Sequence, residues 1–316
     1  MNYSLSKFKS VIEQLMRVYS YRSNQNRYKI ADVEIGGDPG KRPVVLIGSI
    51  FYRGDKRLHS GSGDFNRKLA EAALSLQDEM SDKTGNPCMV DVVLSNNQNI
   101  PKYLNFVEQK TDSPILLDAP TPEIRIEGLK YIAEVGFKER IIYNSIMPSY
   151  TNEEIDKIRE LQIKSSIFLS WDIREHTTKG RIKIIKEKLR PLANEANISS
   201  PIFDAGVIDL PSLGQACEVI DILKDELGLV IGCGAHNAVS TWSGLKNKFG
   251  ENAEKTCIAS VMAAVVMSGA DFILYGPVDH APNVFPSVAS IDAALSQIRI
   301  DRCENVPRNH PRYLIA

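Results

Sequence analysis

The sequence predicts an α/β fold, a (β/α)8 TIM barrel with an N-terminal helix and a β-hairpin ahead of it. Apolar, β-branched runs of strand length recur along the chain, and a helical segment follows each of them. These runs are continuous rather than alternating, as expected of parallel strands buried on both faces. The eight runs are residues 43–48, 89–94, 114–118, 140–144, 165–170, 201–204, 229–232 and 271–275.

Helix start and stop signals lie between these runs. The segment 181–196 should be helical but should kink or break before Pro191. Two further helical segments, 237–249 and 253–268, lie between the seventh and eighth runs. The expected boundaries are Asp64 to Met80, Thr121 followed by Pro122, a capping box of Thr151 and Glu154, and Ser212 to Gly228.

Strict alternation without a long polar linker indicates one barrel domain over residues 28–316. A doubly wound open sheet is the alternative. Extended runs around Gly36, Gly37, Pro39 and Gly40 predict a hairpin that caps the base of the barrel. Residues 1–27 are expected to form a helical extension, because apolar residues recur there at helical spacing. This amphipathic helix would dock on its own domain or a partner, or else lie on a membrane surface.

Composition limits the class of protein. The 316 residues are 43% hydrophobic and 24% charged with a formal net charge of −1, which is typical of a soluble globular protein without a nucleic-acid partner. Charges interrupt the N-terminal apolar positions too often for a signal peptide or a membrane span. Five widely spaced cysteines without a CxxC pair favour a reducing, cytoplasmic setting.

Polar residues follow the apolar runs, and in a barrel such residues meet at the active-site mouth. Asn144 raises a specific question, because a polar amide directly after a buried strand needs a hydrogen-bonding partner. No Cys and His cluster is present, so no metal site is expected. The sequence also lacks a nucleophile elbow and a strand-end lysine, which argues against the nucleophilic chemistries that use them. The polar set is Ser49, Asp91, Asp118, Asn144, Ser170, Asp172, Asp204 and Asn237.

A ring of Asp and Asn suits a ligand with several donors along a planar edge, such as a pterin. Asp118 or Asp204 would be the bidentate acceptor for its amino-pyrimidinone edge. Any one of these residues could instead cap the next helix, and Asp172 and Asp91 are the strongest candidates for a structural role. The segment "GCGAHN" could alternatively cradle a phosphate, although this signal is weak.

The motifs "IGGDPG", "VLIGSIFYRGDK", "YNSI", "DAGVIDLPSLG" and "LYGP" together resemble the H-subunit family of tetrahydromethanopterin S-methyltransferase. That family includes relatives that move methyl groups between tetrahydrofolate and a corrinoid protein. The resemblance covers about residues 28–295 and implies a barrel, a tetrahydropterin (tetrahydrofolate or tetrahydromethanopterin) as methyl carrier, and a cobamide on a partner protein. It also implies a homodimer, with possible peripheral contact to a membrane methyltransferase complex.

In the wider pterin-dependent methyltransferase group, matching positions are Asp118, Asn144 with Ser145, Asp204 and Asn237. Two departures are the "LDAP" motif, where a Ser often follows the Asp, and the extra N-terminal helix. The catalytic residues expected near N5 of the pterin are Asn144 and Asn237. The full set of expected pterin-binding residues is Asp91, Asp118, Asn144, Ser145, Ser170, Asp204 and Asn237.

Two rival functions remain open. A dihydropteroate synthase on the same barrel would handle a pyrophosphate leaving group and would need cations near the strand ends. Only Arg53, Lys56 and Arg57 cluster there, and these residues could simply form a solvated loop. The other rival is a non-catalytic subunit that docks a corrinoid protein or a membrane complex, which an intact Asp and Asn ring argues against.

Overall fold

A computed structural model describes residues 19–59 and 63–315. Eight parallel strands close into a barrel in the order β10-β3-β4-β5-β6-β7-β8-β9, which confirms the predicted barrel and excludes an open sheet. Every predicted run overlaps one of these strands. They are β3 (Val45–Ile50), β4 (Cys88–Val93), β5 (Ile115–Asp118), β6 (Ile141–Ile146), β7 (Ser165–Leu169), β8 (Ser200–Asp204), β9 (Ile231–Cys233) and β10 (Phe272–Pro277).

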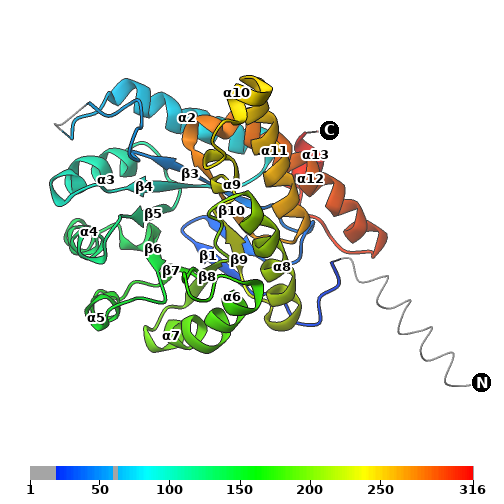
Figure 1. Ribbon diagram of the computed structural model, residues 1–316, viewed down its shortest axis with the longest axis horizontal. Helices are drawn as coiled ribbons and strands as arrows, with labels where there is room; N and C mark the ends of the chain where they lie inside the picture. Colours follow the sequence, from blue (N-terminus) through cyan, green and yellow to red (C-terminus); the bar gives the residue numbers. More distant parts are fainter. Residues whose placement is uncertain (1–18, 60–62, 316) are drawn as a thin grey trace, which may run out of the picture.

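Helices surround the barrel (Figure 1). The α-helices are α2 (Arg67–Thr84), α3 (Ile100–Glu108), α4 (Pro122–Val135), α5 (Asn152–Glu160), α6 (Thr178–Ile184), α7 (Arg190–Glu195), α8 (Leu210–Leu227), α9 (Asn237–Ser240), α10 (Leu245–Phe249), α11 (Asn252–Met267), α12 (Ala281–Asp301) and α13 (Pro311–Leu314). Short 3-10 turns are η1 (Asn97–Asn99), η2 (Lys138–Arg140) and η4 (Val278–His280), and η3 (Ile185–Leu189) is a π-helical turn.

Two predicted helix starts are wrong by two or three residues. Asn66, not Asp64, caps α2, because its side chain accepts a hydrogen bond from the Leu69 N–H at 3.1 Å. Asp209, not Ser212, caps α8. The Asp209 carboxylate accepts from the Ser212 N–H at 2.9 Å, and the Ser212 hydroxyl accepts from the Asp209 N–H in return. The predicted end of α8 at Gly228 is confirmed.

The capping box predicted for α5 forms only in part. Thr151 accepts from the Glu154 N–H at 3.2 Å, but the Glu154 carboxylate is buried against other side chains instead of returning to the cap. The predicted kink or break before Pro191 takes the form of a π-helical turn, η3, after which the helix continues as α7. The turn η3 places the Arg190 N–H on the Ile185 carbonyl, so Pro191 falls where the regular hydrogen-bond ladder is already interrupted.

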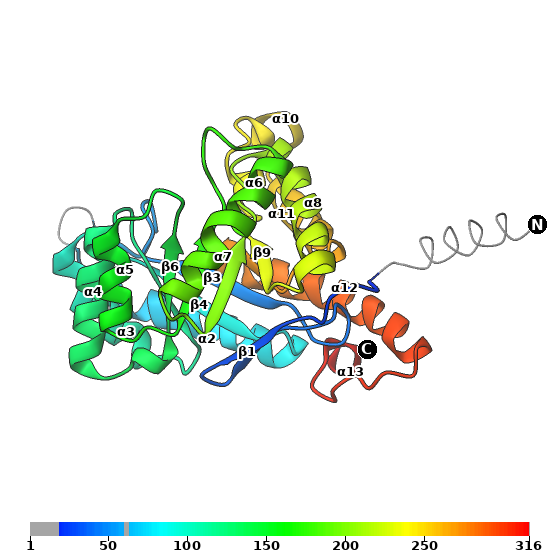
Figure 2. The same cartoon turned by 90° about the horizontal axis from the view of Figure 1, so that it is seen from below.

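A hairpin closes the base of the barrel, as predicted. Strands β1 (Arg27–Ile30) and β2 (Val33–Gly36) pair antiparallel, and Ile30 and Ile35 pack into the apolar cluster of residues that point inside the barrel. Figure 2 shows β1 lying across the end of the barrel away from α10. The turn, however, lies at residues 31–32 and not around the glycines, so both strands precede Gly37.

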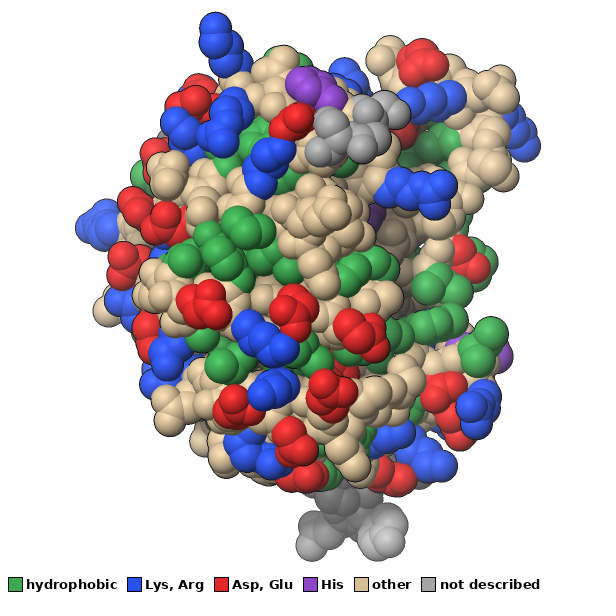
Figure 3. All heavy atoms as spheres, turned by 90° about the vertical axis from the view of Figure 1, so that its left-hand side faces the viewer, with side chains coloured by type: hydrophobic (Ala, Val, Ile, Leu, Met, Phe, Trp, Pro, Cys, Tyr) green, Lys and Arg blue, Asp and Glu red, His purple; other side chains and the backbone are tan. Residues whose placement is uncertain are grey.

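The predicted N-terminal helix falls on residues 1–18, which lie outside the described part of the chain. Residues 19–26 are irregular and run beside α8, where the Asn26 N–H donates to the Gly228 carbonyl at 2.8 Å. Among the described residues no helix has the length and apolar character to cross a membrane. Over α3, α4 and α5 the surface mixes acidic and basic side chains (Figure 3). On α5, for example, Lys157 pairs with Glu160 at 2.6 Å.

Candidate active site

A cavity of about 580 Å³ opens at the carboxyl ends of the strands. Six of the seven residues predicted to bind a pterin line it, and the exception is Ser170. The lining residues from the prediction are Asp91, Asp118, Asn144, Ser145, Asp204 and Asn237, and Ser49, Tyr52, Trp171, Gly206 and His236 are among their neighbours. Leu274, Gly276 and Pro277 of β10 line it as well, so the closed barrel brings residues from all eight of its strands or following loops to one opening.

Asn144 finds its partner within the protein. Its Nδ2 donates to Asp91 Oδ1 at 3.1 Å, and the Ser49 hydroxyl donates to Asp91 Oδ2 at 2.7 Å. Burial raises the pKa of the Asp91 carboxyl to about 6, although both hydrogen bonds oppose that shift. Asp91 is thus a buried acceptor that fixes Asn144, and it also reaches the cavity wall. The peptide bond between Asn144 and Ser145 is cis.

Asp118 ends β5 beside this network. Its pKa is raised well above the usual value, first by burial and then by the nearby Asp91 charge, while Arg125 opposes the shift. Arg125 is itself buried. It donates to the Ala119 carbonyl at 2.6 Å and to Glu154 Oε1 at 3.1 Å. Glu154 also accepts from the Tyr143 hydroxyl. This buried charge pair holds the end of β5 from behind the cavity.

Asp204 ends β8 across the barrel from Asp91. Its Oδ1 accepts from the Gly206 N–H at 2.7 Å, and burial raises the pKa of its carboxyl to about 6. Ser170 supports it from outside the cavity, since the Ser170 hydroxyl donates to the Asp204 carbonyl at 2.9 Å. Arg181 donates to the Gly206 carbonyl at 2.7 Å and so fixes the following loop. Ser170 therefore has a structural position here.

Asn237 opens α9 at the far side of the cavity. Its Nδ2 donates to the Val207 carbonyl at 2.9 Å, which ties it to the loop after β8. The preceding His236 was not among the predicted site residues, yet it lines the cavity. Its Nδ1 pairs with the Leu274 carbonyl at 3.1 Å, and burial lowers its pKa. A neutral ring that donates from Nδ1 leaves Nε2 as an acceptor.

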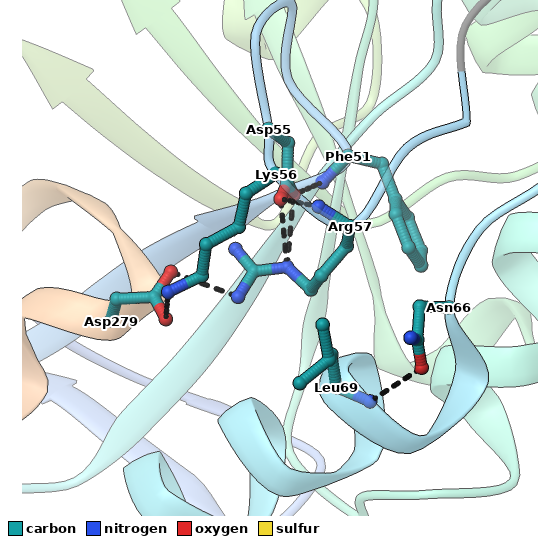
Figure 4. Close-up of polar contacts among 7 residues, drawn as sticks. All are labelled: Phe51, Asp55, Lys56, Arg57, Asn66, Leu69 and Asp279. Carbon is teal, nitrogen blue, oxygen red and sulfur yellow. Dashed lines mark hydrogen bonds and ion pairs between the residues drawn. The ribbon is translucent and has the colours of Figure 1, made fainter.

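The solvated loop considered from sequence is correct for Arg53 and Lys56, which are exposed, but wrong for Arg57, which is buried in an ion-pair cluster after β3. Asp55 accepts from the Phe51 N–H at 2.8 Å and from Arg57 Nε at 3.1 Å, and Arg57 Nη1 donates to Asp279 at 2.8 Å (Figure 4). Lys56 also pairs with Asp279, at 2.9 Å, from the surface. The loop is thereby joined to the end of β10.

The charge of the cavity wall is one-sided. Three carboxyl groups, two carboxamides and two serine hydroxyls from the strand ends and following loops line it, and none of the described lining residues is a lysine or arginine. Within residues 19–59 and 63–315, no group of three or more His, Cys, Asp or Glu side chains could hold a metal ion. Such a wall offers acceptors to a ligand that carries N–H donors.

Fold and site together define a (β/α)8-barrel protein with an acidic ligand site at the carboxyl ends of its strands. The family model for the MtrH subunit of tetrahydromethanopterin S-methyltransferase matches residues 23–305. The chain belongs to this family, which confirms the resemblance seen in its motifs.

The relatives cover nearly the whole chain. The H subunit of tetrahydromethanopterin S-methyltransferase from Methanopyrus kandleri is 32% identical over 310 residues, which is 90% of this chain and 96% of that protein. The protein of the same name from Methanothermobacter thermautotrophicus is 33% identical over 305 residues, 93% of this chain and 98% of that protein.

Solved structures with the same fold include two dihydropteroate synthases. The enzyme from Yersinia pestis aligns with a TM-score of 0.55 at 14% identity, covering 85% of this chain and 98% of that one. The 7,8-dihydropteroate synthase from Vibrio fischeri aligns with a TM-score of 0.61 at 14% identity, covering 86% and 99%. At this identity the likeness concerns the barrel alone.

Proposed function

We propose that this chain is a methyltransferase that moves a methyl group between N5 of a tetrahydropterin and the cobalt of a corrinoid protein. The observation that carries the proposal is the cavity wall of three carboxyl groups and two carboxamides without a cation. The amino-pyrimidinone edge of a pterin presents adjacent N–H donors, and a carboxylate accepts two parallel hydrogen bonds from such an edge.

The roles follow from the contacts of each residue. Asp204 and Asp118 hold the pterin ring, because each lines the cavity and accepts from backbone N–H groups of its own loop, which leaves carboxyl lone pairs for a ligand. Asp91 already accepts from Ser49 and Asn144, so it orients Asn144 more than it binds ligand. Ser145 lines the same wall, and Ser170 contributes indirectly by supporting Asp204.

Asn144 and Asn237 are the residues proposed to lie nearest N5. A tertiary amine is a poor leaving group, so loss of the methyl group requires protonation or stabilisation of charge at N5. Each amide has its Nδ2 occupied by the protein, which fixes the side chain so that its carbonyl oxygen can accept from a protonated N5. The cobalt of the corrinoid supplies the nucleophile that takes the methyl group. Positioning and electrostatics supply most of the rate.

The rival dihydropteroate synthase chemistry is less well supported. A pyrophosphate leaving group needs cations beside the ring, whereas Arg57 is committed to Asp55 and Asp279 and Lys56 to Asp279. Arg53 of that cluster lines an adjoining cavity and not the one that Asp91 and Asp204 line. A purely docking subunit would have no need of three clustered, desolvated carboxyl groups, which are costly to retain without a ligand.

The methyl carrier is proposed from the names of the relatives. Those proteins are named as the H subunit of a tetrahydromethanopterin methyltransferase, so tetrahydromethanopterin is the first carrier to test, with tetrahydrofolate as the alternative. The corrinoid partner, peripheral contact with a membrane complex, a homodimer and a cytoplasmic location belong to the same proposal.

Calorimetric titration with methyl-tetrahydromethanopterin and methyl-tetrahydrofolate tests the proposal. Asp118→Ala should abolish measurable binding, whereas Asp172→Ala, on a loop outside the cavity lining, should leave it unchanged. Loss of the cob(I)alamin absorbance on mixing with the bound methyl-pterin would then establish transfer. A folded protein that binds neither pterin would refute the proposal.

A further inference from the structure

A second cavity of about 990 Å³ adjoins the first. The two share Val93 and Asp118 in their walls, so they meet at the ends of β4 and β5. The second cavity lies between the loops that follow β3, β4 and β5. Phe51, Arg53, Asn96 and Tyr103 are among its lining residues, and we refer to this cavity as the tail chamber.

The tail chamber has a rigid inner wall. Phe51 and Tyr103 stack with ring centroids 4.3 Å apart, and Phe51 also packs on Phe65 at 4.6 Å. Asp55 lies in the chamber wall and holds the Phe51 N–H, while Arg57 braces Asp55 from behind (Figure 4). A wall held by a buried ion pair and aromatic stacking is preorganised for a ligand.

The chemistry of the wall changes from inside to outside. Buried apolar side chains such as Phe51, Leu94 and Tyr103 line its inner part. Exposed polar side chains follow, among them Asn96, and the cationic Arg53 lies at the solvent side. This gradient fits an elongated ligand with a flat apolar group near the first cavity and an anionic end near solvent.

The direction of a bound pterin leads to this chamber. In the closed barrel β8 and β4 are four strands apart in either direction, so Asp204 and Asp91 face each other across the mouth. A pterin whose amino-pyrimidinone edge rests on Asp204 therefore points its opposite end, which carries the side chain at C6, toward Asp91 and Asp118. Asp118 borders both cavities.

We propose that the tail chamber binds the arylamine tail of the tetrahydropterin, with the aryl ring against the Phe51 side and the anionic end at Arg53. This inference rests on the proposed function and adds to it a second binding site on the same ligand. Tetrahydrofolate and tetrahydromethanopterin share the aryl ring and differ beyond it. Discrimination between them would then lie at the solvent end, around Arg53 and Asn96.

The test compares each full methyl-tetrahydropterin with 5,6-dimethyltetrahydropterin, which lacks the tail, by calorimetry. Ser95→Phe places a ring in the chamber from an exposed position whose hydroxyl accepts only from Asn99 Nδ2 within the described residues. It should weaken binding of the full ligand about tenfold or more, the range expected when a hydrophobic pocket is lost to one group. Binding of the tailless pterin should stay unchanged.

Arg53→Ala provides a second variant that perturbs no buried contact, and it should weaken only the ligands with an anionic tail. Lys56→Ala is the matched control, because Lys56 is a cation on the same loop that does not line the chamber. Equal affinity of wild-type protein for full and tailless pterins would overturn the tail site while leaving the proposed function intact. Failure to bind either ligand would overturn both.

Discussion

Protonation of Asp204 should control pterin binding, because burial moves the pKa of this carboxyl group into an accessible pH range. Burial raises the pKa of the carboxyl to about 6 in the free protein. Only the carboxylate accepts two N–H donors, so affinity should fall as pH decreases through about 6. At pH 5 about one-tenth of the free protein carries the carboxylate, which predicts about tenfold weaker binding than at pH 8 from this group alone.

Asp204→Asn tests the charge at nearly constant shape. Hydrogen bonds to a charged acceptor contribute about 1.5–3 kcal/mol each, so loss of one should weaken binding at pH 8 about 10- to 150-fold. The variant should also lose its share of the pH dependence. Calorimetry in two buffers of different ionisation enthalpy should show proton release on binding near pH 5.5 to wild-type protein, and less to the variant.

The same group has the opposite effect on stability. Its pKa is higher in the folded than in the unfolded chain, so the folded protein binds the proton more tightly, and stability from this group is lost as pH rises from about 4 through about 6. Asp204→Asn should therefore unfold at higher urea than wild type at pH 7. Unchanged wild-type affinity between pH 5 and 8, or full affinity in Asp204→Asn, would refute this account. Asp172→Asn is the control.

Two further predictions concern the walls of the site. Arg57→Leu leaves the Asp55 carboxyl buried without its cation and should cost about 3–5 kcal/mol of unfolding free energy in a urea titration. Lys56→Ala removes a largely exposed pair and should cost at most about 0.5 kcal/mol. Similar losses in the two variants would contradict the burial argument. Asn144→Ala removes a donor to the Asp91 carboxylate, so the pKa of Asp91 should rise above about 6 in a carboxyl-carbon NMR titration. A lowered or unchanged pKa of Asp91 would show that the hydrogen bond is unimportant.

The strands and the site were predictable from local pattern, because buried parallel strands are continuous apolar runs and the barrel places every strand end at one opening. Asp91, Asp118 and Asn144 could thus be grouped although they are far apart in the chain. Helix starts were less predictable, since Asp64 and Asn66 are both good caps and tertiary contacts decide between them.

The supporting contacts were not predictable. Arg57 pairs with Asp279, which lies 222 residues further along the chain, so no local pattern could separate a buried arginine from a solvated one. His236 carried a weak signal, because it directly precedes the predicted Asn237 at a strand-end turn. Ser170 was correctly placed at a strand end, but its hydroxyl turns toward the Asp204 carbonyl and not toward the cavity, a choice that residue type alone does not fix.

Apolar side chains of the strands fill the barrel interior, and the hairpin at the base packs onto them. Ile30 and Ile35 fill the end opposite the mouth with apolar side chains. A ligand of Asp204 must therefore enter and leave past the rim of the mouth. For a reaction between two large molecules this imposes a sequence of events. The smaller molecule must be seated before the larger one covers the rim, and it can leave only after the larger one has moved away.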